Sequence, residues 1–111
     1  RALPSLESPH SYRRTPLAYI RLSIARPLHG QERRLEDLMR RIAAAVAEHD
    51  GCLESYVLSP GDDSGEVARI GIYTDEDAAE RTANNATIMA LRSELHLVSE
   101  PGHVERAFFT V

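Results

Sequence analysis

Several residue types are scarce or missing in this sequence of 111 residues. Lysine is absent, which excludes a Schiff-base lysine and the lysine of a P-loop. The only cysteine, Cys52, cannot form an intrachain disulfide or a cysteine-rich zinc site, and we expect it to be a small buried residue. No apolar run approaches the roughly 20 residues of a membrane helix, and no signal-peptide core is recognisable. We therefore expect a cytoplasmic protein that has no membrane partner.

Positive charge is not clustered either. All 13 basic residues are arginines, the formal net charge is −4, and in the main predicted helix arginines alternate with Glu and Asp. Nucleic-acid binding needs clustered positive charge, so we expect no nucleic-acid partner. The 5 histidines are scattered without metal-ligand spacing, so no metal site is predicted.

Hydrophobic periodicity predicts six elements. Strands are expected over residues 17–26, 52–59, 66–73 and 103–111, because apolar residues recur there with β-strand spacing or in short runs bounded by turns. A helix is expected over 31–50, where apolar residues recur at three- and four-residue steps. A second helical region, capped at Thr74, runs to about residue 83, is interrupted at Asn84-Asn85 and resumes over about 87–95.

The order of these elements predicts the fold class. It is α+β, with the ferredoxin-like βαββαβ arrangement of one antiparallel sheet and helices on one face. Residues 1–16 contain three prolines and no periodic pattern, so we expect a flexible N-terminal arm followed by one domain over 17–111. Both faces of the strands carry apolar residues, and a second copy would cover the bare face, which predicts a homodimer.

Two stretches and the order of the elements resemble the antibiotic biosynthesis monooxygenase-like family of dimeric α/β-barrel proteins. The stretches are His49 to Tyr56 and Ile72 to Ala78, and the overall resemblance covers most of residues 17–111. It implies a pocket between sheet and helices in each subunit. Some members of the family oxygenate polycyclic phenols without a metal or flavin, so the resemblance implies a cofactor-independent monooxygenase acting on a small aromatic or quinol-type molecule.

Three positions depart from the family's usual pattern. Tyr73 stands where members often have Trp, Thr82 lies near a frequent His, and Asn84-Asn85 replace a frequent Ser. Haem degradation is a second alternative, which the missing helix histidine disfavours because haem iron needs an axial ligand. The first alternative is a non-catalytic dimeric module of the same fold that binds a small ligand.

Six residues are candidates for the site. For catalysis these are Tyr73, Asn84 and Asn85, and for substrate binding Arg21, Tyr56 and His96. Each also has a structural interpretation: a core aromatic for Tyr73, a helix break for the Asn pair, an ion pair at the dimer face for Arg21 and a surface position for His96.

Overall fold

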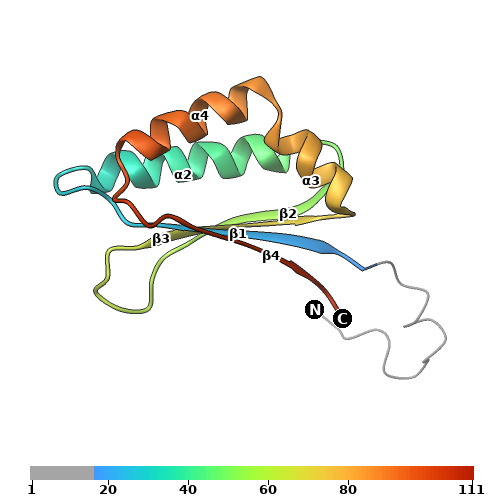
Figure 1. Cartoon of the computed structure of the whole chain (residues 1–111), viewed down its shortest axis with the longest axis horizontal. Helices are drawn as coiled ribbons and strands as arrows, with labels where there is room; N and C mark the ends of the chain where they lie inside the picture. Colours follow the sequence, from blue (N-terminus) through green and yellow to red (C-terminus); the bar gives the residue numbers. More distant parts are fainter. Residues whose placement is uncertain (1–16) are drawn as a thin grey trace.

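The computed structural model describes residues 17–111 and has the predicted α+β architecture. The strands are β1 (Tyr19–Ala25), β2 (Cys52–Leu58), β3 (Val67–Tyr73) and β4 (Val104–Phe109), and the helices are α2 (Glu32–Ala47), α3 (Glu76–Ala83) and α4 (Ala86–Leu97). The strands form one antiparallel sheet in the order β2-β3-β1-β4. All three helices lie on one side of it (Figure 1). The ferredoxin-like prediction is confirmed, while the predicted arm lies outside the described residues.

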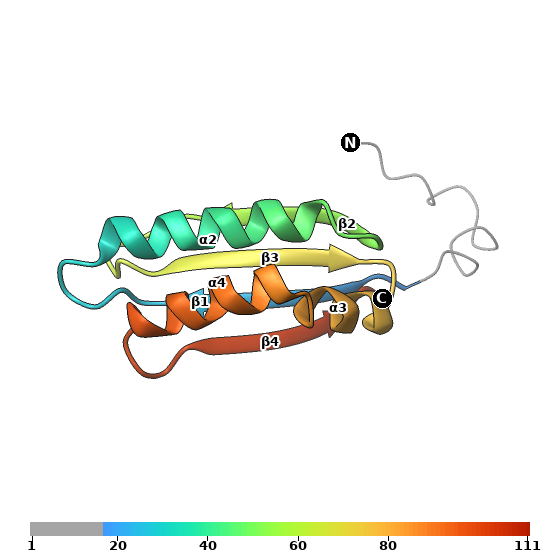
Figure 2. The same cartoon turned by 90° about the horizontal axis from the view of Figure 1, so that it is seen from above.

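The apolar stripe of α2 forms most of the core. Its buried side chains are Leu35, Leu38, Met39, Ile42, Ala43 and Val46. They recur at helical spacing, so they face the sheet together. Viewed from above, α2 runs along β2 and β3, and α4 lies over the other half of the sheet (Figure 2).

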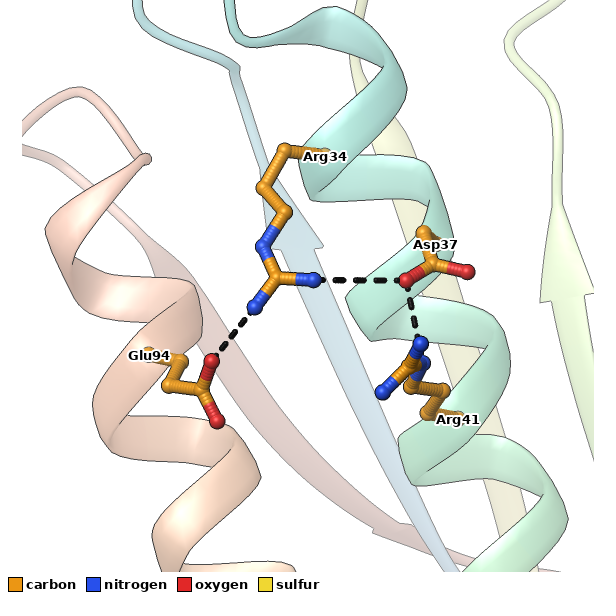
Figure 3. Close-up of polar contacts among 4 residues, drawn as sticks. All are labelled: Arg34, Asp37, Arg41 and Glu94. Carbon is orange, nitrogen blue, oxygen red and sulfur yellow. Dashed lines mark hydrogen bonds and ion pairs between the residues drawn. The ribbon is translucent and has the colours of Figure 1, made fainter.

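Ion pairs join the two long helices on their solvent side. Arg34 of α2 lies 2.5 Å from Glu94 of α4 and 3.5 Å from Asp37, which in turn lies 3.0 Å from Arg41 (Figure 3). These side chains are all more than 40% exposed, so each pair contributes only about 0.2–1 kcal/mol. The network therefore links α2 to α4 but adds little to the stability of the fold.

The connection from α2 to β2 requires a glycine. Gly51 has a φ of +89°, and a Cβ there would lie 2.5 Å from the Cβ of Ala78 in α3. Helix α3 is therefore packed directly on this turn. Its N-cap is Asp75, whose carboxylate accepts a hydrogen bond from the amide of Ala78, so the predicted cap at Thr74 is wrong by one residue.

The two faces of the sheet differ in an unexpected way. The helix-facing positions of β1 and β3 include polar or small residues, namely Arg21, Ser23, Arg69 and Gly71. The opposite face carries the larger apolar side chains, which are Ile20, Leu22, Ile24, Ile70 and Ile72, with Phe108 and Val104 beside them on β4. The helices thus cover the less apolar face, and the more apolar face is open in one chain.

Candidate functional site

Tyr73 ends β3 on the helix side of the sheet and is 3% exposed. Its ring folds back along the strand over Gly71: a Cβ on Gly71 would lie 2.8 Å from the Tyr73 hydroxyl and 3.0 Å from Cε2. Gly71 is therefore the position that lets the phenol lie flat against the sheet. Burial raises the pKa of Tyr73, and the neighbouring cation of Arg69 opposes that rise. The hydroxyl therefore stays protonated at neutral pH.

Arg69 lies two residues before Gly71 on the same face and is 9% exposed. Its Nε and Nη1 atoms are buried, and within residues 17–111 neither has a hydrogen-bond partner. Leaving a buried donor unsatisfied costs about 1–3 kcal/mol, more when the group is charged. Burial lowers the pKa of Arg69, while Tyr73 and Glu105 act in the opposite direction. This guanidinium is under-satisfied as the fold presents it.

Arg21 approaches the same place from the neighbouring strand, because it pairs with Gly71 across β1 and β3. Its Nη2 donates to Glu80 Oε1 of α3 at 3.0 Å, and its Cζ lies 5.6 Å from the centre of the Tyr19 ring. Burial disfavours the charge of Arg21, but Tyr19 and Glu80 outweigh it and the pKa is raised. The predicted alternative for Arg21, an ion pair at a dimer face, is not what the described chain shows, since Glu80 lies on the helix side.

These side chains share a small cavity between the sheet and the helices. It has a volume of about 20 Å³, enough for one water-sized group. Its lining comprises Arg21, Val46, Arg69, Tyr73, Ala79, Thr82, Ala83, Ile88, Arg92 and Glu105. Three arginines and one carboxylate thus surround the space, together with one phenol.

Two of the arginines have carboxylate partners. Arg21 pairs with Glu80, and Arg92 of α4 lies 3.5 Å from Glu105 of β4. In the described part of the chain, Arg69 has no ion pair, so it supplies the excess positive charge of the cavity. Such a cavity favours an anion or an electron-rich oxygen.

Thr82 also lines the cavity, but its hydroxyl is already used. It donates to the carbonyl of Ala78 at 2.7 Å and lies 3.1 Å from Nδ1 of His49. Since the hydroxyl proton goes to Ala78, the His49 nitrogen is the donor of the second bond. Thr82 therefore holds the end of α3 to the turn after α2.

Comparison with known protein families identifies the family of this chain. The family described as antibiotic biosynthesis monooxygenase matches residues 24–93, which is more than half of the sequence. The chain belongs to the antibiotic biosynthesis monooxygenase family. A comparison with curated proteins found no match.

Solved structures show the same fold as this family member. A protein from Mycobacterium tuberculosis superposes with a TM-score of 0.78 at 13% identity, covering 85% of this chain and 95% of its own. One from Methanosarcina mazei gives 0.79 at 10% identity, with 87% and 96% covered. SnoaB, a cofactor-independent oxygenase from Streptomyces nogalater, gives 0.72 at 20% identity, with 86% and 94% covered. At these identities the likeness establishes the fold alone.

The other residues predicted for a monooxygenase site lie outside the cavity. Asn85 caps α4, with its side-chain oxygen accepting from the amides of Thr87 and Ile88 at 2.9 and 3.1 Å. Asn84 ends α3 and is exposed. The structure thus brings Tyr73 and Arg21 together, and the catalytic role of the Asn pair stays a prediction.

Tyr56 and His96 also lie outside the cavity that contains Tyr73. Tyr56 is 49% exposed on β2 and its hydroxyl contacts Glu54, which raises the pKa of Tyr56. His96 lines an open hollow beside α4 with Met89, Arg92 and Ser93, and its ring centre lies 5.3 Å from that of His103. Arg92 alone lines both this hollow and the cavity of Tyr73.

Sequence reasoning missed Arg69 and Arg92. The signal for Arg69 was available, because residues two and four positions apart in a strand share a face, and Arg69 precedes Tyr73 by four. Arg92 lies in the helical region predicted over about 87–95, where the spacing does not single it out. Among residues 17–111, no group of three His, Cys, Asp or Glu side chains is placed to hold a metal ion, and no helix there is long and apolar enough to span a membrane.

Proposed function

We propose that this family member is a monooxygenase that oxidises a small aromatic or quinol-type molecule without a cofactor. The observation that carries the proposal is the buried, cationic cavity that holds the neutral phenol of Tyr73. Membership of the monooxygenase family supports the reaction class. The description of SnoaB as a cofactor-independent oxygenase supports the absence of a flavin or metal requirement.

Anthrone illustrates the chemistry, because its enol is a tricyclic phenol. Loss of a proton gives an electron-rich ring that reduces dioxygen directly. One oxygen atom replaces the two hydrogens of the ring CH₂ as a carbonyl, and the other leaves with those hydrogens as water, so anthraquinone forms. The four electrons come from the substrate and reduce dioxygen fully.

The protein would contribute to this reaction by electrostatic stabilisation. Guanidinium groups and the Tyr73 hydroxyl would stabilise negative charge that develops on oxygen, and they would do so where little water enters. The cavity holds only one water-sized group, so the ring itself must lie outside it or move its walls.

Oxygen uptake with anthrone tests the proposal, with anthraquinone measured as product. The variant Tyr73→Phe removes the hydroxyl and keeps the ring, and we expect it to lower kcat/KM at least about tenfold. Tyr56→Phe is the matched comparison, because Tyr56 lies on the open face of the sheet away from the cavity. It should leave the rate unchanged, and a lowered rate would support the predicted substrate-binding role of Tyr56. No uptake above the spontaneous rate with any of a set of anthrones, naphthols and hydroquinones would contradict the proposal.

The alternative is a non-catalytic module that binds a small ligand in the same place. The lining favours it, because its one carboxylate, Glu105, is already paired with Arg92 and His103. Binding of anthrone without oxygen uptake, detected by calorimetry, would support this alternative.

The open face of the sheet supports a homodimer. Ile20, Ile70 and Ile72 are only partly covered in one chain, and Phe108 is 43% exposed beside them. Contiguous apolar surface of this kind marks an interaction site, and burying the same face of a second copy covers it symmetrically.

Sedimentation at micromolar concentration tests the homodimer. The wild type should sediment as a dimer and Ile70→Glu as a monomer, because the new carboxylate would be buried in the interface. Leu97→Glu is the control, since Leu97 is 78% exposed on α4 away from the sheet face. A monomeric wild type would contradict the proposal.

A further inference from the structure

Two side chains contact the same oxygen atom of Glu105, the carboxylate in the lining of the cavity. Nε2 of His103 lies 3.0 Å from Oε2 of Glu105, and Nη2 of Arg92 lies 3.5 Å from that same Oε2. The Arg92 contact is long and partly exposed, so it is weak. A stronger bond from His103 to this oxygen would therefore weaken the bond from Arg92.

His103 lies in the turn just before β4 and is poorly satisfied there. Its side chain is 15% exposed, and within residues 17–111 neither ring nitrogen makes a hydrogen bond of suitable geometry. Burial lowers the pKa of His103, as do His96 and Arg92, whereas Glu105 acts in the opposite direction. The fold as described therefore favours the neutral ring.

A protonated His103 would have more positive than negative charge around it. From α4, Arg92 faces it as a permanent cation, and the ring centre of His96 lies 5.3 Å from that of His103. From β4, Glu105 supplies negative charge. The neighbouring strand β1 contributes two uncharged side chains at this level, Ser23 and Ile24. Protonation therefore strengthens the bond to Glu105 and at the same time repels the two side chains of α4.

Helix α4 is packed on the core but is joined to β4 by a weak contact. Its buried residues, Ile88 and Leu95, belong to the core cluster that α2 dominates. Among residues 17–111, the ion pair from α4 to β4 is Arg92–Glu105, and both side chains form part of the wall of the Tyr73 cavity. Separation of this pair would therefore open the cavity between α4 and β4.

We infer that His103 is a proton switch: when its ring takes up a proton it binds Glu105, displaces Arg92 and opens the cavity between α4 and β4. The closed form binds the proton more weakly than an open form in which the ring is hydrated. Acidification therefore shifts the equilibrium toward the open form. The switch goes beyond the proposed function, because it governs access to the cavity whatever molecule the protein oxidises.

The accessibility of a thiol placed in the cavity tests the switch. Ala79 lines the cavity and is 2% exposed, so Ala79→Cys in a Cys52→Ser background puts the protein's one thiol there. The reagent is 4,4′-dithiodipyridine, which reacts with thiols in acid as well as at neutral pH, and each rate is divided by that of the unfolded protein at the same pH. From about pH 8 to about pH 5 we expect this relative rate to rise at least about threefold.

Variants assign the effect to His103. His103→Gln should remove the pH dependence, and the exposed His29→Gln should keep it. Arg92→Ala removes a side chain of the cavity wall, so labelling should be fast at both pH values. A pH-independent rate in the parent protein, a pH dependence that survives in His103→Gln, or one that His96→Gln alone abolishes would overturn the inference.

Global unfolding is measured separately. Ala43 is buried on α2 away from the cavity, so the thiol of Ala43→Cys in the Cys52→Ser background reports unfolding of the whole domain. At about pH 5 it should react more slowly than the thiol at position 79, and equal rates would overturn the inference.

A measurement on the wild type covers the case in which Ala79→Cys does not fold. By NMR, the Nε–H signal of Arg92 should shift with the same pH midpoint as the ring of His103, because one displaces the other from Glu105. An Arg92 signal that stays constant across that midpoint would overturn the inference.

Discussion

Gly71 offers the sharpest test of how the site is built. An alanine there would place its Cβ 2.8 Å from the Tyr73 hydroxyl, 3.0 Å from Cε2 and 3.1 Å from Cζ. The ring is rigid and 3% exposed, so it has little room to move aside. Overpacking of this kind costs about 1–3 kcal/mol. Replacing a glycine also restricts the unfolded chain, which returns about 0.4–1 kcal/mol, so we expect Gly71→Ala to lower the free energy of unfolding by about 1–2 kcal/mol.

A double-mutant cycle isolates the contact. Tyr73→Leu removes the contacting hydroxyl and both contacting ring carbons, so in that background Gly71→Ala should be neutral or stabilising. Gly61→Ala is the control, because nothing lies within 4 Å of a Cβ there and its backbone is unstrained. Urea unfolding at equilibrium measures all four proteins and the control. If Gly71→Ala costs the same with Tyr73 and with Leu at position 73, the ring does not lie over Gly71 and the described cavity is wrong.

Three further predictions concern individual contacts. Asn85→Ala should lower the free energy of unfolding by about 0.5–2 kcal/mol, whereas Asn85→Ser, which keeps a capping side chain, should lower it less. If both variants lower oxygen uptake with anthrone without lowering stability, Asn85 is catalytic instead. Glu80→Gln should change stability by less than about 1 kcal/mol, because Glu80 is 55% exposed, and the change should shrink at high salt in urea unfolding. Burial lowers the pKa of His103, although Glu105 acts in the opposite direction. On acidification, His103 therefore takes up its proton at a lower pH in the native state than in the unfolded chain. Stability should therefore fall as the pH drops below about 6.5, and His103→Gln should reduce that loss. An equal or steeper loss in the variant would contradict the prediction.

The elements were predictable because their patterns are strong. The stripe from Leu35 to Val46 has helical spacing throughout, and the helix break at Asn84-Asn85 is where α3 ends and α4 begins. The position of Tyr73 at the end of a strand followed from the same reasoning. Residue spacing thus sufficed for the order and approximate bounds of the elements.

The face of each strand was harder to predict. In β1 the apolar set, Ile20, Leu22 and Ile24, lies on the open side, whereas a monomer would turn that set toward its helices. Apolar alternation identifies two faces but does not say which one the helices cover. For the same reason Arg69 was overlooked: whether an arginine within a strand is buried depends on which layer it meets.

The central claim is that the reactive oxygen of a ligand lies between Arg69 and Tyr73, on the helix side of the sheet. A crystal structure of the protein with bound 4-nitrophenol tests it most directly. The phenolate oxygen should lie within hydrogen-bond distance of Arg69 Nε or Nη1. A ring bound instead on the open sheet face, with no contact to Arg69, would contradict it.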